Sequence, residues 1–166
     1  AANSAYAGMI LGYTRIQNDG IESAERVIQV TDSMTVLITE QSTNVSVAFV
    51  VPPSGNIEVE YNSFLFASSR TITFALSDDA SFQEIDESHT YDAGSVKPDE
   101  TDSDIITVKW AITGLTPGAS LTYYIAAQVS ANYAYIYHGR NRTTGVHYPP
   151  IIVKATALPA TIVTGE

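Results

Sequence analysis

The sequence has no cysteine, few basic residues and no long apolar run. Without cysteine there are no disulfide bonds and no thiolate zinc sites. Eight lysine and arginine residues stand against eighteen aspartate and glutamate residues, so the formal net charge is −10. Such a charge repels polyanions, which argues against nucleic acid and against anionic membranes as partners. The apolar runs are also far shorter than the roughly 20 residues that a membrane-spanning helix needs.

The start of the chain lacks the features of a secretion signal. It begins Ala1-Ala2-Asn3, with no methionine, no basic segment and no long apolar segment. Two interpretations stay open: removal of an initiator methionine before a small residue, which predicts a complete short product, or excision from a longer chain. The 166 residues have the size of one domain, and no linker rich in glycine or serine divides them.

What the sequence does contain is a large share of β-branched and aromatic residues. Thirty residues are valine or isoleucine and ten are tyrosine, whereas seven are leucine and three are lysine. Branched and aromatic side chains lose rotamer freedom in helices and pack well on pleated surfaces. The composition therefore predicts an all-β protein.

Alternation of apolar and polar residues with a period of two marks the expected strands. Residues 45–51 and 57–61 alternate in this way, and between them lies a proline-rich turn in which Gly55 supplies a positive φ. Beyond Asn62, Phe64 and Phe66 fall in register with glutamates. This strand is therefore expected either to bulge or to pass from a half-exposed to a doubly covered position.

Other segments show the same alternation, and together they predict about ten strands. They are residues 8–16, 33–40, 71–77, 105–113, 121–129, 131–138 and 151–158. Residues 21–30 are ambiguous, because the first part could form a short helix, although residues 26–30 favour a strand. Short strands joined by turns at this spacing are typical of a β-sandwich or jelly roll. One long irregular stretch, from Asp78 to Asp104, interrupts the pattern.

This irregular stretch contains ten of the eighteen acidic residues and one lysine. Carboxylates at this density could hold a calcium ion, and Asp99, Asp102 and Asp104 are the nearest to a ligand series. Their spacing matches no EF-hand loop, and a solvated acidic loop is the simpler interpretation.

No motif predicts catalysis. His89, His138 and His147 lack the spacing that brings two imidazoles to one metal ion, and there is neither a GxSxG elbow nor a glycine-rich phosphate loop. We therefore expect no enzymatic activity, no cofactor and no metal site beyond the calcium candidates.

The region from Tyr133 to Tyr148 combines tyrosines, histidines and arginines and contains no acidic residue. Tyrosine and arginine are enriched at interfaces because each offers a large contact area together with a hydrogen-bond donor. The candidates for contact with a partner or a glycan are Tyr133, Tyr135, Tyr137, His138, Arg140, Arg142 and Tyr148. The alternative interpretation is that the tyrosines at 133, 135 and 137 form the core-covering face of one strand.

The order of motifs from about Gly8 to Pro159 resembles a family of trimeric jelly-roll domains found in virion proteins of tailed bacteriophages. These domains are related in fold to the tumour-necrosis-factor and complement C1q heads. The motifs are GYTRI, VSVAFVVPPSGNIEVEYNSF, TITFALSDDASF, PDETDSDIITVKWAITGLTPGASLTYYIAA and YPPIIVKATALPAT. The resemblance implies a C1q/TNF-like jelly roll of residues 13–166 and a homotrimer. A second resemblance, to fibronectin type III, is poorer, because Leu121 stands where that domain has its tyrosine.

Two functions follow from the resemblance as expectations. The first is a capsid decoration or cement protein, a trimer on the head surface that binds the major capsid protein and stabilises the shell through an extended N-terminal arm, residues 1–12. The alternative is an adhesin at the tip of a tail fibre or spike that recognises a glycan or protein receptor on the host cell.

Overall fold

The computed structural model describes residues 6–17, 27–66, 70–83, 94–96, 103–140, 145–163 and 165. For residues 94–96, 103, 104 and 140 it describes the backbone alone. These parts of the chain form thirteen strands, and the predicted all-β class is confirmed. The strands beyond the expected ten are two- and three-residue pairings, too short to produce a visible alternation in the sequence.

Six strands form the larger sheet. They are β1 (Ile10–Ile16), β13 (Ile151–Ala157), β5 (Ile57–Phe66), β8 (Ser103–Ile112), β10 (Ala134–Tyr137) and β2 (Val27–Val30). β5 is the central strand, because β8 pairs with one edge along its whole length. Its other edge is shared: β13, followed by β1, pairs with the first part of β5, and β10, followed by β2, pairs with the last part.

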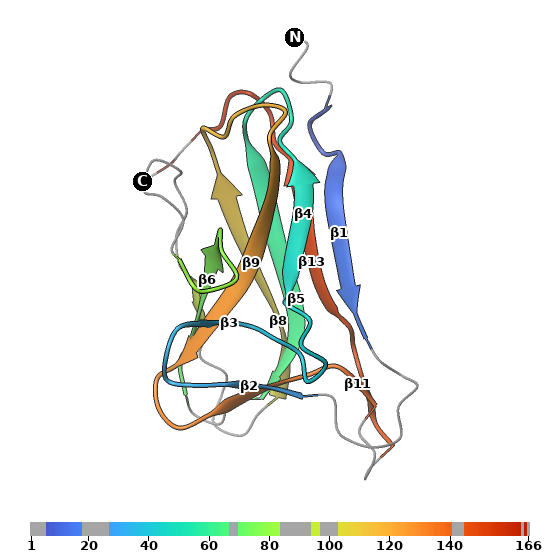
Figure 1. The fold of residues 1–166 in the computed structure, drawn as a ribbon, viewed down its shortest axis with the longest axis vertical. Coiled ribbons are helices and arrows are strands. Elements are labelled where there is room, and N and C mark those ends of the chain that lie inside the picture. Colours follow the sequence, from blue (N-terminus) through green and yellow to red (C-terminus); the bar gives the residue numbers. More distant parts are fainter. Residues whose placement is uncertain are drawn as a thin grey trace.

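Five strands form the second sheet. They are β3 (Thr35–Val36), β4 (Ser46–Val50), β9 (Ser120–Val129), β6 (Ile72–Ser77) and β7 (Gly94–Val96). β9 is central, with β6 on one edge and β4 and β3 in succession on the other. In Figure 1 the two sheets lie one behind the other, with β9 crossing in front of β5 and β8. A short third sheet joins β11 (Gly139–Arg140) to β12 (His147–Tyr148).

The core lies between the two large sheets and is built from the alternate residues of each strand. Trp110 of β8 is buried there, as is Tyr61 of β5, whose ring lies 5.2 Å from that of Phe74 of β6. This ring pair joins the two sheets. The described residues therefore form a β-sandwich with one continuous hydrophobic core.

At two glycines, the backbones of neighbouring segments come unusually close to each other. A side chain at Gly12 of β1 would meet the Ala48 carbonyl oxygen of β4 at 2.2 Å, so only glycine lets β1 lie against β4 here. Gly55 has the positive φ expected of it, 72°, and a side chain there would lie 2.7 Å from the Leu115 carbonyl oxygen. A hydrogen bond from the Leu115 amide to the Gly55 carbonyl also joins the segment that contains Leu115 to the turn that contains Gly55.

The alternation in β5 continues through all ten residues without a bulge. Phe64 and Phe66 therefore face outward with the glutamates, and neither predicted outcome is observed: the strand has no bulge, and its outward residues stay half-buried from Glu58 to Phe66. Phe64 is half-buried because the rings of Tyr137 and Tyr148 pack against it.

The less regular segments are placed as follows. β1 begins at Ile10, so residues 10–12 of the predicted arm lie in the larger sheet, and the Gly8 amide already bonds to the Ala157 carbonyl. The ambiguous segment 21–30 contains the strand β2, and residues 21–26 lie outside the described residues. Within the predicted irregular stretch, β7 lies at Gly94–Val96 and β8 starts at Ser103.

Candidate binding surface

The outer face of the larger sheet carries the side chains that are available for recognition. Because β5 alternates strictly, Glu58, Glu60 and Asn62 point outward in its first half, and Phe64 and Phe66 point outward in its second half. The neighbouring strands repeat this division: Lys154 and Lys109 pair with Glu60, whereas Tyr137 and Tyr135 pair with the phenylalanines. The face therefore has a polar half and an aromatic half.

The aromatic half carries a group of aromatic side chains, which we call the aromatic cluster. It consists of Phe64, Tyr135, Tyr137, Phe66, which stands opposite Tyr135 in the register, and Tyr148 of the adjoining strand β12. Tyr137 and Tyr148 stack with their ring centres 4.9 Å apart, and Phe64 lies 4.8 Å from Tyr148. Tyr135 lies 6.3 Å from Tyr137. Each such pair contributes roughly 0.5–1.5 kcal/mol beyond the burial of area, so the cluster is a pre-ordered surface.

The polar half is organised around Glu60. Its carboxylate lies 2.8 Å from the Lys154 amine and 3.7 Å from the Lys109 amine. The hydrogen bond and the charge of Glu60 raise the pKa of Lys154. Next to this group, the Thr107 hydroxyl donates a 2.6 Å hydrogen bond to the Asn62 side-chain oxygen. The charge of Glu60 is therefore compensated within the sheet.

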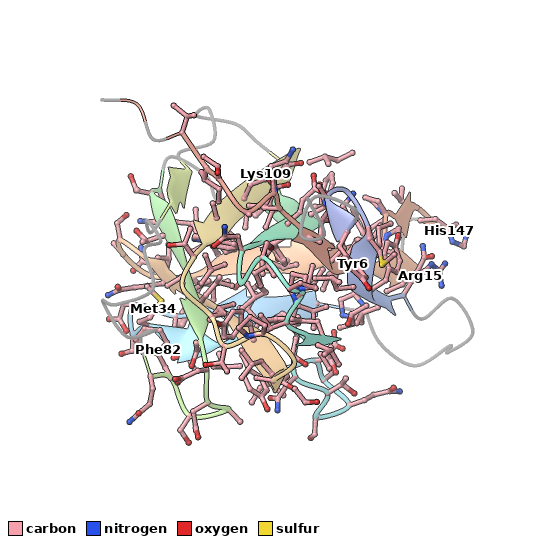
Figure 2. All side chains as sticks on the ribbon, turned by 90° about the horizontal axis from the view of Figure 1, so that it is seen from above. Tyr6, Arg15, Met34, Phe82, Lys109 and His147 are labelled. Atoms are coloured by element: carbon pink, nitrogen blue, oxygen red, sulfur yellow. The ribbon has the colours of Figure 1, made fainter. Side chains whose placement is uncertain are left out.

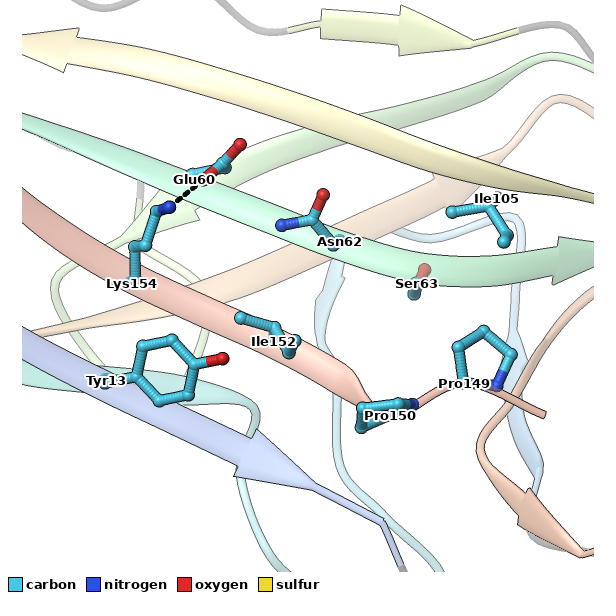
Figure 3. Close-up of a pocket in the computed structure, with 9 residues that line it drawn as sticks. All are labelled: Tyr13, Glu60, Asn62, Ser63, Ile105, Pro149, Pro150, Ile152 and Lys154. Carbon is cyan, nitrogen blue, oxygen red and sulfur yellow. Dashed lines mark ion pairs between the residues drawn. The ribbon is translucent and has the colours of Figure 1, made fainter. Parts of the chain in front are cut away.

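A shallow groove of about 400 Å³ lies where the two halves meet. Figure 3 shows Tyr13 of β1, Ile152 of β13 and Ile105 of β8 around it, with the Glu60–Lys154 ion pair towards one end. Ile105 is 63% exposed and Tyr13 is 55% exposed. Large apolar side chains at that exposure, gathered on one face, are typical of an interaction surface.

The predicted contact residues do not all reach this surface. Tyr135, Tyr137 and Tyr148 lie in the aromatic cluster, because Ala134 and Ile136 occupy the core side of β10. The core-covering interpretation therefore does not describe the tyrosines of this strand. Tyr133 precedes β10 and is 53% exposed.

The two basic candidates and the histidine have different positions. His138 is 2% exposed, with its Nε2 atom 3.6 Å from Glu40, so it offers no area to a partner at the surface. The backbone of Arg140 pairs with His147 in the short third sheet. Arg142 lies outside the described residues.

The calcium candidates are only partly described. Asp104 lies on β8 opposite Leu65, and Asp99 and Asp102 fall outside the described residues. Within the described part of the chain, no three His, Asp or Glu side chains come together as metal ligands. The same part of the chain contains no helix of the length and apolarity that a membrane span requires.

Sequence reasoning missed several residues of the surface, namely Tyr13, Phe64, Ile105 and Ile152. A signal existed for Phe64, whose register with the glutamates showed that it faces outward. No such signal existed for Tyr13, Ile105 and Ile152. These residues become neighbours only because β1, β13, β5 and β8, which are distant in sequence, pair with one another. Comparison with models of protein families gives no match, and a search of curated proteins finds no similar sequence.

Proposed function

We propose that this chain is a structural protein of a bacteriophage virion, a homotrimer that decorates the capsid and stabilises the head shell. The proposal rests on the motif resemblance described above and on the fold. Its main structural support is the outer face of the larger sheet, where exposed apolar residues and the aromatic cluster suit association with further copies of the chain.

The proposal includes a jelly-roll topology of the C1q/TNF type, which the strand order supports. Eight strands remain when β2, β3, β10, β11 and β12 are set aside. In chain order they are β1, β4, β5, β6, β7, β8, β9 and β13. One sheet then has the order first, eighth, third, sixth, and the other the order second, seventh, fourth, fifth. A jelly roll of two interleaved Greek keys has this arrangement.

We place the contact between copies on the outer face of the larger sheet. Its exposed apolar residues, Tyr13 and Ile105, flank the groove, and the aromatic cluster continues the same face. Beside the groove, the charge of Glu60 would not be left unpaired by burial, because Glu60 already contacts two lysines. An interface that buried an unpaired charge would be strongly disfavoured.

The mass of the protein in solution tests this placement. Light scattering behind size exclusion is expected to give three subunits for the wild type and a smaller mass for Ile105→Glu. Val50→Glu is the matched control, because Val50 lies on β4 in the other sheet and is 54% exposed. The placement is wrong if the wild type is a monomer, or if both variants keep the mass of the wild type while circular dichroism shows that both are folded.

The decoration role predicts a separate attachment to the shell through the start of the chain. Removal of residues 1–5 leaves β1 and its pairing with β13 intact, since β1 starts at Ile10. This truncation is expected to abolish occupancy on capsids without changing the mass of the oligomer. Capsids that bind the truncated protein as well as the full chain would contradict the arm mechanism. Immunogold labelling of virions is expected to place gold over the head.

The second candidate function is an adhesin at a fibre or spike tip, and the aromatic cluster is the observation that favours it. Ordered tyrosine rings offer flat apolar faces together with hydroxyl groups, which suit sugar rings. Gold at the tail tip would favour the adhesin. In that case Tyr148→Ala is expected to reduce binding to host cells without loss of particle integrity.

A further inference from the structure

A second cavity, separate from the groove on the outer face, lies beside the buried histidine. It has a volume of about 220 Å³ and is formed by the end of β1, the turn of residues 39–43 and the junction of β10 with β11. Among the eight described residues that line it, only Ile16 has a hydrocarbon side chain. In Figure 2, Arg15, which lines the cavity, lies on the same flank of the molecule as His147 of β12.

The walls of this polar pocket are held in place by hydrogen bonds. The turn is closed by the Thr39 amide, which donates to the Thr43 carbonyl at 2.9 Å, and by the Thr43 amide, which donates to the Thr39 hydroxyl at 3.1 Å. On the opposite wall, the Gln17 side-chain amide donates to the Tyr148 carbonyl at 3.0 Å. Arg15 in turn donates to the Gln17 side-chain oxygen. A pocket with fixed walls loses little conformational entropy when a ligand binds.

Glu40 is fixed in the same way. One of its carboxylate oxygens accepts a hydrogen bond from the Val27 amide, and the other lies 3.6 Å from Nε2 of His138. His138 itself is held by the core around the end of β10. The Val27 amide and the His138 ring therefore hold the carboxylate of Glu40 in one position at the wall of the pocket.

The chemistry of the lining selects a class of ligand. Arg15 offers donors only, Glu40 offers acceptors only, and the Gln and Thr side chains offer both. A phosphate or carboxylate ligand would be repelled by Glu40, and an amine would be repelled by Arg15. A neutral molecule with several hydroxyl groups satisfies both, because a hydroxyl donates to the carboxylate and accepts from the guanidinium.

We propose that this polar pocket binds one neutral pyranose unit of a saccharide, held by hydrogen bonds to Arg15, Glu40 and Gln41. The site goes beyond the decoration role and does not depend on the oligomer. If the chain is an adhesin, the pocket adds a polar subsite next to the aromatic cluster, since Gln17 binds the backbone of Tyr148.

Nuclear magnetic resonance on the full chain tests the proposal, with glucose, galactose and mannose as neutral probes and N-acetylneuraminic acid as the charged probe. At least one neutral sugar is expected to shift the amide signals of residues 39–43 with a dissociation constant in the millimolar range, roughly 1 mM. Glu40→Gln is expected to weaken that binding at least tenfold. It keeps an oxygen that accepts from the Val27 amide, so the fold is expected to persist.

Glu58→Gln is the matched control, because Glu58 lies on the outer face of β5, away from the pocket, and it is expected to leave the affinity unchanged. Gln41→Ala, at an exposed position, provides a second test if Glu40→Gln does not fold. Three outcomes would each overturn the proposal: no shift with any neutral sugar, binding of N-acetylneuraminic acid alone, or an affinity that neither pocket variant changes.

Discussion

The outer faces of the two large sheets differ sharply, although both sheets cover the same core. The larger sheet presents the aromatic cluster, a neutralised polar group and exposed apolar residues around a groove. The outward residues of β4 and β9 in the other sheet are mostly small or hydroxyl-bearing, namely Ser46, Ala48, Thr122 and Tyr124, and Val50 is the exposed apolar exception. Among the described residues, the ring pairs outside the core all involve Phe64 or Tyr137 of the larger sheet. Core packing constrains the residues on the inner faces of both sheets. The residues on the outer faces are free of this constraint and can differ according to what each face binds.

The largest effect is expected where the two sheets meet, because a change there disturbs both outer faces together. Phe74→Ala removes the ring that packs on Tyr61 and leaves a cavity in the core. The free energy of unfolding is expected to fall by about 3–5 kcal/mol, measured by denaturant titration at one protein concentration. Phe74→Leu fills much of the space and is expected to cost less. Equal losses for both variants would contradict the cavity explanation.

The next effect concerns alkaline pH and compares a buried tyrosine from each sheet. Burial raises the pKa of Tyr61 on β5, and burial followed by the charge of Asp78 raises the pKa of Tyr123 on β9 to about 12. The unfolded chain releases these protons near pH 10, so the stability that they contribute is complete below pH 10. It is lost as pH rises towards the folded pKa, by about 1.4 kcal/mol per pH unit for each tyrosine.

Denaturant titrations at pH 8, 10 and 11 measure this loss. Replacement of both residues by phenylalanine is expected to flatten the dependence above pH 10, since the titrating hydroxyl groups are absent. If the free energy of unfolding of the double variant fell with pH above pH 10 as steeply as that of the wild type, other titrating groups would be responsible.

A smaller effect is expected within the outer faces themselves. Tyr137→Ala removes three ring pairs of the aromatic cluster and is expected to lower the free energy of unfolding by about 1.5–3 kcal/mol, because each pair contributes at least about 0.5 kcal/mol. Tyr124→Ala, on the outer side of β9, removes no described ring pair and is expected to change it by less than about 0.5 kcal/mol. Equal effects would remove the contrast between the two faces.

The smallest effect is expected in the polar half of the larger sheet. Lys154→Met removes the closest partner of Glu60, but Lys109 remains within 3.7 Å and solvent screens the group. The free energy of unfolding is expected to fall by no more than about 0.5 kcal/mol, and this loss is expected to shrink further in 1 M salt. Thermal melts of the wild type and the variant at low and high salt measure this difference. A loss that grows with salt would contradict the electrostatic origin.

Local pattern predicted the long strands well. β4 (Ser46–Val50) lies within the predicted strand 45–51, β5 (Ile57–Phe66) extends the predicted strand 57–61, and the turn between them uses Gly55 with a positive φ. These features depend on neighbours along the chain, which the sequence displays. β3 lies within the predicted strand 33–40, although it is only two residues long. The short strands β7, β11 and β12 were not predicted, because two or three residues are too few to show an alternation and pair only where another strand offers an edge.

The candidate surface was predicted less completely than the fold. Tyr135, Tyr137 and Tyr148 were recognised from their composition and do lie together. His138 was included with them, yet it is buried, because the alternation of β10 continues into it after the outward Tyr137. Its contact with Glu40 joins residues almost a hundred positions apart, and no local pattern indicates such a pairing.

The order of β-branched, aromatic and turn residues was enough to determine the all-β class, the longer strands and the alternation that separates core from surface. These properties follow from steric preferences and from burial of alternate side chains, and both act between near neighbours. Tertiary structure alone decided which strands share an edge. It thereby brought Tyr13, Phe64, Ile105 and Tyr148 onto one face and closed the polar pocket around Glu40 and His138, because these sites are made by segments that meet only when the sheets form.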